Sequence, residues 1–172
     1  MSQNEPSPVS AREQALRLIK FRPRSEGELR VRLSRRHFSG SEIETVLLEL
    51  RQKGLVDDAR FAQLFAAQRM SSRPVGRRGL LAQLRAKGIH GEMAQQAVDV
   101  ETTGDSERAL AYKLTEQRIA RMKGLSPQAV ERRLYGFLTR RGFPADVIHE
   151  AIKKARVSKN EPSPRSCDQG DS

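Results

Sequence analysis

The chain has 172 residues, of which 37% are hydrophobic and 31% are charged. This composition indicates a globular protein with a small core, of the kind built from thin helical modules. The formal net charge is +11. Residues 1–10 and residues 157–172 each carry −1, so residues 11–156 carry +13. Charge of this density attracts polyanions, so nucleic acid or a partner coated with nucleic acid is the expected target. A role in solubility alone is the weaker explanation, because acidic residues would serve solubility as well.

Several classes of protein are excluded by what the chain lacks. Cys167 is the single cysteine, so neither a disulfide framework nor a Cys-x-x-Cys metal site is expected. The three histidines, His37, His90 and His149, are too scattered to ligate a metal. No stretch approaches the roughly 18 apolar residues of a membrane span, and the N-terminus lacks an apolar signal core. We expect a cytosolic protein without cofactor, metal or membrane contact.

In chain order, the first predicted elements are a tail and a three-helix unit. Residues 1–9 are rich in Pro, Ser and Asn without apolar periodicity, which indicates a disordered tail. Residues 10–56 predict the first unit, with helices over 10–21, 26–36 and 41–53. Ser-x-x-Glu capping boxes begin at Ser10, Ser25 and Ser41. Gly54 follows the third helix, as is usual just after a helix C-terminus.

Two further units and a second tail follow. Residues 57–104 predict helices over 58–71, 76–87 and 91–101, and residues 105–156 predict helices over 105–121, 127–141 and 145–156. Asp57 or Asp58 can cap a helix that presents Phe61, Leu64 and Phe65. Ser126 followed by Pro127 marks another helix start, and Gly88 and Gly142 mark helix ends. Residues 157–172 predict a second disordered tail.

The three units are copies of one pattern. Residues 29–38, 80–89 and 134–143 share Leu-x3-Leu-x2-[Arg/Lys]-[Gly/His]-[Phe/Ile]. The second leucines are Leu33, Leu84 and Leu138, at spacings of 51 and 54 residues, and we expect all three to be buried. No window shows the alternation that strands require. The predicted fold is all-α, with three tandem three-helix repeats resembling helix-turn-helix units in an elongated, modular chain.

Catalytic constellations are not visible in this sequence. Asp57 and Asp58 form the one prominent carboxylate pair, and a helix N-cap explains them more simply than acid–base chemistry. The segment Gly76-Arg-Arg-Gly79 is basic and glycine-containing, but it lacks the Gly-Lys-[Ser/Thr] of a phosphate-binding loop and any preceding strand. We therefore predict a protein that is not an enzyme and works by binding.

Basic clusters recur in the second predicted helix of each unit. The competing interpretation is a solvent-exposed helix face, because runs of charged residues usually form such a face. The clusters lie at matching positions and consist mostly of arginine, which binds phosphate or carboxylate through paired hydrogen bonds. The candidate binding residues are Arg35, Arg36, Arg77, Arg78, Arg85, Lys87, Arg132, Arg133, Arg140 and Arg141.

These motifs resemble the RecX family of bacterial regulators. The resemblance rests on Ser25-x-x-Glu28-Leu29, on Gly-Leu-Val-Asp-Asp-Ala-Arg-Phe-Ala at 54–62, and on Gly79-x4-Leu84-x2-Lys87-Gly88-Ile89. It covers roughly residues 11–156 and is more specific in the middle unit than in the outer ones. Where members of the family often have glycine at the end of the first unit's second helix, this chain has His37. The turn before Phe38 is therefore expected to differ slightly.

The resemblance implies a function that composition does not. Members of the family bind the RecA recombinase filament on single-stranded DNA and restrain its ATP hydrolysis and strand exchange. The resemblance thus implies RecA filament as the partner and weak, non-specific contact with single-stranded DNA, and we expect a monomer. The alternative is a helix-turn-helix transcription regulator. Such proteins usually dimerise on a palindromic site, whereas the tandem units here come without a separate dimerisation domain.

Overall fold

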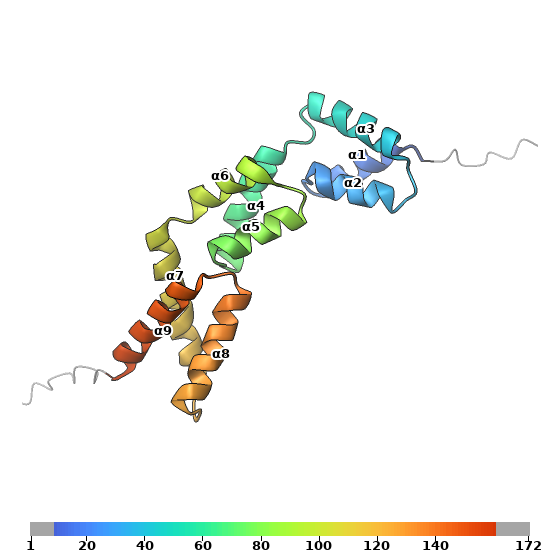
Figure 1. Cartoon of the computed structure of the whole chain (residues 1–172). Coiled ribbons are helices and arrows are strands. Elements are labelled where there is room, and N and C mark those ends of the chain that lie inside the picture. Colours follow the sequence, from blue (N-terminus) through green and yellow to red (C-terminus); the bar gives the residue numbers. More distant parts are fainter. Residues whose placement is uncertain (1–8, 161–172) are drawn as a thin grey trace, which may run out of the picture. The chain divides into compact units, whose positions relative to one another are not determined.

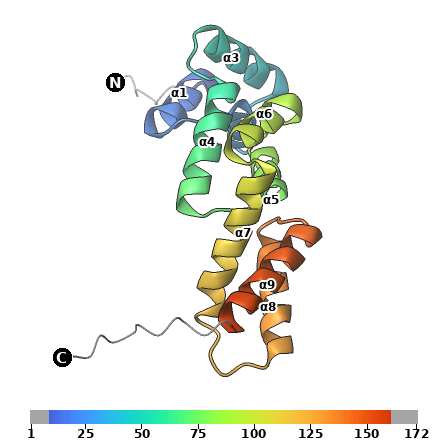
Figure 2. The same cartoon turned by 90° about the vertical axis from the view of Figure 1, so that its left-hand side faces the viewer.

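The computed structural model describes residues 9–160, and Figures 1 and 2 show helices connected by short turns throughout this range. No strand occurs in the part of the chain that the structure describes, which confirms the all-α prediction. Most of residues 1–9 and 157–172, the predicted tails, lie outside the described range. The helices are α1 (Ala11–Phe21), α2 (Glu26–Ser34), α3 (Gly40–Gln52), α4 (Asp58–Ser72), α5 (Arg77–Ala86), α6 (Gly91–Glu101), α7 (Gly104–Ile119), α8 (Pro127–Arg140) and α9 (Ala145–Asn160).

Local capping explains where several of these helices begin. Ser10 forms the predicted capping box with Glu13, Ser25 Oγ accepts a hydrogen bond from Glu28 N–H, and Ser126 caps α8. The predicted box at Ser41 is wrong. Ser39 caps α3 instead, together with Glu42. The sequence contains two overlapping Ser-x-x-Glu patterns here, and Ser39 is the serine with the extended backbone that a cap requires.

The last predicted boundary also differs from the structure. Helix α9 continues to Asn160, four residues beyond the expected end at 156 and into the segment 157–172 that was expected to be a tail. Lys153, Lys154 and Arg156 lie in the C-terminal half of this helix, toward the end where basic side chains interact favourably with the helix dipole.

The turn after α2 has a left-handed residue despite lacking glycine. His37 has a φ of 66°, while Gly88 and Gly142, at the equivalent places after α5 and α8, have φ of 82° and 78°. The turn after α2 was expected to differ from the other two, but its backbone adopts the same left-handed conformation. His37 adopts a conformation that costs energy for a residue with a Cβ atom, and glycine adopts it freely.

The repeated leucines occupy equivalent core positions. Leu33, Leu84 and Leu138 are each fully buried, as predicted. In the first repeat, α1, α2 and α3 enclose an apolar cluster that includes Leu29 and Leu47. In the third repeat, a second cluster is formed by α7, α8 and α9 around Leu134 and Ile148. In these two repeats, apolar residues of each helix thus bury one of its faces.

By its internal contacts the chain divides into two compact units. The first contains the residues up to Arg73 together with Leu80–Glu101, and the second contains Pro74–Gly79 together with the residues from Thr102 onward. The start of α5 therefore packs with the second unit, while the remainder of α5 packs with the first.

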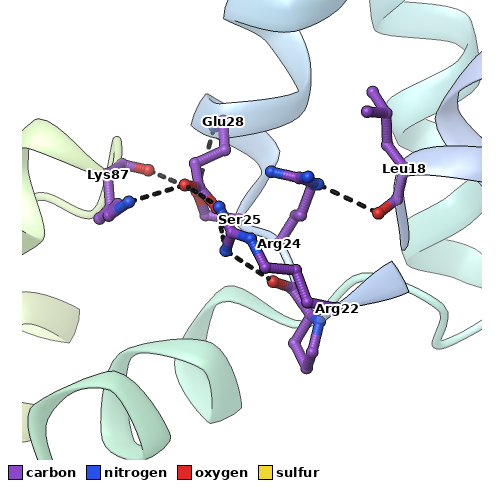
Figure 3. Close-up of polar contacts among 7 residues, drawn as sticks. Leu18, Arg22, Arg24, Ser25, Glu28 and Lys87 are labelled. Carbon is purple, nitrogen blue, oxygen red and sulfur yellow. Dashed lines mark hydrogen bonds and ion pairs between the residues drawn. The ribbon is translucent and has the colours of Figure 1, made fainter. Parts of the chain in front are cut away.

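Inside the first unit, the start of α2 packs against the turn that follows α5. Gly27 approaches Gly88 so closely that a Cβ atom on Gly27 would lie 2.6 Å from Gly88 Cα. Ser25 Oγ donates a hydrogen bond to the carbonyl oxygen of Lys87, and Lys87 Nζ donates to Glu28 Oε1 at 2.8 Å (Figure 3). Asp58 Oδ1, from the start of α4, accepts a hydrogen bond from Glu26 N–H at 2.8 Å. Three hydrogen bonds and the close approach of two glycines therefore join the first repeat to the second.

The second unit repeats this arrangement with different residues. Gly76 N–H donates to the carbonyl oxygen of Arg141 at 2.9 Å, and a Cβ atom on Gly76 would lie 2.6 Å from Gly142 O. Glu107 Oε1, from the first turn of α7, accepts a hydrogen bond from Arg77 N–H at 2.7 Å. In both units, a carboxylate of the next repeat therefore caps the second helix of the preceding one.

Candidate functional site

The structure separates the ten candidate basic residues into three groups. The first group contacts the protein itself. Lys87 pairs with Glu28, and Lys87 Nζ also lies 5.9 Å from the centroid of the Phe65 ring. Arg141 Nη1 donates to the carbonyl oxygen of Pro74 at 2.9 Å. These two residues, at equivalent positions in the second and third repeats, hold neighbouring repeats together through these contacts.

Two more candidates, Arg36 and Arg77, also belong to this first group. Arg36 Nη1 donates to Gln14 Oε1 at 2.9 Å. Arg77 Nη1 lies 3.4 Å from the carbonyl oxygen of Thr102, in addition to the backbone hydrogen bond to Glu107. A second group, Arg35, Arg78 and Arg85, is exposed to solvent. Arg85 borders a shallow hollow beside Glu92, where a carboxylate is already close.

The third group lines a pocket of arginines in the third repeat. Arg132, Arg133 and Arg140 project from α8 into a hollow of about 550 Å³. Its remaining lining residues are Arg118, Arg121, Met122 and Gly136. On α8, Arg132, Gly136 and Arg140 are four residues apart, so they form one row along the helix surface. We call this site the arginine pocket.

Arg118 and Arg121 were not among the residues predicted from the sequence. They lie in the last turn of α7 and just after it, whereas the predicted basic clusters lie in the second helix of each repeat. The segment Gln117-Arg-Ile-Ala-Arg-Met-Lys-Gly124 contains three basic residues and no acidic one, and this was the signal available. The Arg118 guanidinium lies 5.2 Å from the centroid of the Phe137 ring, a cation–π contact that restrains it.

The arginines of the pocket differ from those of the first repeat in their partners. Arg12, Arg22 and Arg30 pair with Glu49, Glu28 and Glu44 at 2.9, 2.9 and 2.7 Å. Within residues 9–160, none of the five pocket arginines forms an ion pair, and no carboxylate lines the pocket. The nearby Glu131 is occupied by Arg156 at 2.8 Å. The pocket therefore combines strong positive potential with unused hydrogen-bond donors.

A second hollow, of about 490 Å³, lies in the first unit and is more apolar. Leu16, Ile19, Leu55 and Leu64 line it, together with Arg24. Arg24 is 9% exposed, and its Nε donates to the carbonyl oxygen of Leu18 at 3.1 Å (Figure 3).

Burial, followed by the neighbouring charges of Arg22 and Arg32, lowers the pKa of Arg24 below its ordinary value, and the charge of Glu28 opposes this.

The carboxylate pair at the start of α4 serves as caps. Asp57 is the N-cap of α4, and its Oδ1 accepts a hydrogen bond from Arg60 N–H at 2.9 Å. The capping prediction is thus confirmed for Asp57. Asp58 caps α2 of the preceding repeat instead of its own helix. Burial raises the pKa of Asp58, with the charges of Glu26 and Asp57 adding to the effect and the hydrogen bond from Glu26 N–H opposing it.

Neither a metal site nor a membrane span is found among the described residues. No group of three or more His, Cys, Asp or Glu residues in that range is placed to hold a metal ion. None of the helices there is both long and apolar enough to cross a bilayer.

The fold and the pocket together define a class: an all-helical protein of tandem three-helix units with an arginine-lined surface. Models of the first, second and third three-helix domains of RecX match residues 11–50, 57–98 and 105–152. The chain belongs to the RecX family of regulatory proteins. A regulatory protein RecX from Amycolatopsis mediterranei is 37% identical over 144 residues, which are 84% of this chain and 82% of that one.

Other comparisons agree. A regulatory protein RecX from Thermobifida fusca is 35% identical over 158 residues, covering 90% of this chain and 85% of that protein. The crystal structure of RecX from Lactobacillus salivarius matches with a TM-score of 0.71 at 20% identity, over 86% of this chain and 95% of that one. A crystal structure of a regulatory protein RecX matches with a TM-score of 0.74 at 24% identity, over 84% and 71% of the two chains. At these identities the two structures support the fold alone.

Proposed function

We propose that this protein binds the RecA recombinase filament on single-stranded DNA and inhibits its ATP hydrolysis and strand exchange. It acts in the cytoplasm as a monomer and has no catalytic activity of its own. Family membership supports the choice of partner. The observation that supports a nucleoprotein target in particular is the arginine pocket. Five arginines line it, and no carboxylate of the described residues does, so the pocket matches a surface rich in phosphate.

Inhibition requires a difference in affinity between two states of the filament. A ligand shifts an equilibrium only by the ratio of its affinities for the two states. A protein of tandem units can contact several recombinase subunits and the DNA they hold at once, so its affinity falls when the subunits change their spacing. The protein would then stabilise a filament state that hydrolyses ATP slowly, or block the addition of further subunits.

The direct experiment measures ATP hydrolysis by RecA on circular single-stranded DNA while this protein is titrated. We expect hydrolysis to fall to a plateau, and we expect no phosphate release from this protein without RecA. Reversing two charges in Arg132→Glu/Arg133→Glu should weaken the inhibition while the helical circular dichroism stays unchanged, since exposed charges contribute little to folding. Unchanged hydrolysis at saturating concentrations would contradict the proposal.

A salt titration separates this proposal from the transcription-regulator alternative. Binding to bare DNA should be weak, independent of sequence and steeply reduced by salt, because counterions are released on binding. Filament binding should fall less steeply, since part of that interface is protein. Tight binding to one duplex sequence, with equal salt dependence for both targets, would favour a helix-turn-helix regulator instead.

A further inference from the structure

The strongest unassigned feature of the molecule is the arginine pocket between the end of α7 and the face of α8. It concentrates five positive charges around one hollow. Like charges at this spacing repel one another and destabilise the folded chain. Helix dipoles explain part of the arrangement, because Arg118 and Arg140 lie in the last turns of their helices. They do not explain Arg132 and Arg133, which lie within the first two turns of α8.

Gly136 provides a second, independent observation. It lies in the middle of α8, where glycine destabilises a helix relative to alanine. Packing does not require it. Beyond the backbone of its own helix, a Cβ atom at this position would meet one atom within 4 Å, Nη1 of Arg140, at 3.3 Å. The absent side chain instead leaves the floor of the pocket open and leaves room for the Arg140 guanidinium.

We propose that the arginine pocket binds the phosphodiester backbone of single-stranded nucleic acid, with Gly136 keeping its floor open. This inference rests on the proposed function and assigns the DNA contact within it to one site. Guanidinium groups donate paired hydrogen bonds to phosphate oxygens, and several around one hollow can hold consecutive phosphates of a flexible strand. Single strands can follow such a groove without any readout of sequence.

The composition of the pocket favours phosphate over a protein partner. Protein interfaces depend on apolar or aromatic anchors that are buried at their centre. Met122 is the single apolar side chain lining the arginine pocket. The hollow of the first unit has the opposite character, with apolar walls that include Ile19 and Leu64. An acidic protein segment would therefore find little in the arginine pocket beyond charge.

The test uses the full chain and a fluorescent oligothymidylate, with RecA absent. The pocket variant is Arg121→Gln/Arg132→Gln/Arg140→Gln. The control variant, Arg17→Gln/Lys113→Gln/Lys153→Gln, loses the same net charge from exposed residues outside the pocket. We expect the pocket variant to bind about tenfold more weakly at moderate salt, and the control to remain within about twofold of the wild type. Equal losses in both variants would mean that net charge alone acts, and would overturn the proposal.

The salt dependence of binding supplies a measurement that a purely structural role would not change. Each phosphate contact on a single strand contributes about 0.7 to the slope of log K against log salt. Losing three contacts should therefore reduce the slope by about 2. On a methylphosphonate oligonucleotide, whose backbone is neutral, the wild type and the pocket variant should bind equally weakly. A pocket effect that persists on the neutral backbone would contradict phosphate binding.

Two competitors distinguish the possible sources of negative charge. Inorganic tripolyphosphate should compete only weakly, because it spans fewer sites than a strand. If tripolyphosphate competes as well as an oligonucleotide at the same concentration of phosphate groups, the pocket is a site for a free polyphosphate. Polyglutamate that competes as well as the oligonucleotide would mean an acidic-protein site. Either result would overturn the assignment to nucleic acid.

Gly136→Ala keeps the proposal testable if the triple variant folds poorly. Alanine should raise the melting temperature, because it favours the helix. It should also weaken oligothymidylate binding, because its Cβ displaces the Arg140 guanidinium. Higher stability with unchanged binding would refute the role given to the open floor.

The outcomes also separate this inference from the proposed function. If the pocket variant binds oligothymidylate normally, this inference fails while RecA inhibition can stand. If the wild type binds DNA through the pocket but leaves RecA unaffected, the proposed function fails and the pocket remains a DNA site.

Discussion

Gly27 and Gly88 touch through their backbones, although 61 positions separate them in the chain: a Cβ atom on Gly27 would lie 2.6 Å from Gly88 Cα. The contact brings the start of α2 against the turn after α5, where Ser25 and Glu28 both reach Lys87. Helix ends, which carry unsatisfied backbone groups, are thus paired between repeats. Glycine at both positions is what permits this approach.

Gly27→Ala should therefore destabilise the first unit by about 1–3 kcal/mol, because a methyl group would overlap backbone atoms that cannot rotate away. The measurement is the midpoint of urea unfolding followed by circular dichroism. Gly40→Ala is the matched control: Gly40 lies in the first turn of α3, and a methyl group added there would meet no atom within 4 Å, so its replacement should not destabilise. Equal effects of the two changes would show that the close approach is unimportant.

Glu28 should make stability depend on acid pH. Desolvation acts to raise its pKa, but hydrogen bonds from Arg22 and Lys87, with their charges, outweigh it, so the pKa of Glu28 lies below its ordinary value of 4.5. A lowered pKa means that Glu28 stabilises the folded state above about pH 4.5, and that this contribution disappears as pH falls through the folded-state pKa. The stability difference between wild type and Glu28→Gln should shrink in that window.

A double-mutant cycle with Lys87→Met isolates the pair. The coupling between Glu28 and Lys87 should be about 0.5–1 kcal/mol at neutral pH, since both side chains are partly exposed. The coupling should vanish once Glu28 is protonated. A coupling that is independent of pH would contradict the ion pair.

Asp58 should respond differently to asparagine and to alanine. An asparagine side chain would keep an oxygen that can accept the hydrogen bond from Glu26 N–H, and it would remove a charge that is costly to bury. Because the folded-state pKa of Asp58 is raised, its ionisation destabilises the protein as pH rises above the ordinary value of 3.8. Asp58→Asn should therefore be neutral or stabilising at pH 7, whereas Asp58→Ala should cost about 1 kcal/mol.

Asp57→Ala is the companion measurement. It should also cost about 0.5–2 kcal/mol, through loss of the N-cap of α4. Thermal unfolding measures both effects. If the alanine variants of Asp57 and Asp58 fold normally and yet lose all inhibition of RecA, the capping role is insufficient and these carboxylates act in function.

His37→Gly should stabilise the protein by about 1 kcal/mol, because glycine adopts the left-handed conformation of this turn without the steric cost that a Cβ atom brings. Chemical unfolding measures the effect. His90→Gly is the control: His90 is also exposed but has no positive φ, so glycine there should destabilise slightly. A loss of stability in His37→Gly would contradict the strain.

The sequence by itself determined the helices, the repeat and the buried leucines. Apolar residues three and four apart, serine caps and glycine stops are local signals, and each acts within a few residues. Ser10, Ser126 and Leu84 could therefore be placed correctly from the printed chain. The error at Ser41 arose where two capping patterns overlap, and a local pattern cannot choose between them.

The tertiary structure alone decided what the long polar side chains do. From the sequence, Asp58 was a candidate cap of its own helix and Lys87 a candidate ligand-binding residue. In the structure, both contact the preceding repeat. Arg118 joins Arg132 in one pocket because α7 and α8 pack together. A charged side chain can reach many groups from one backbone position, and its partner is fixed only when helix packing brings one of those groups within hydrogen-bond distance.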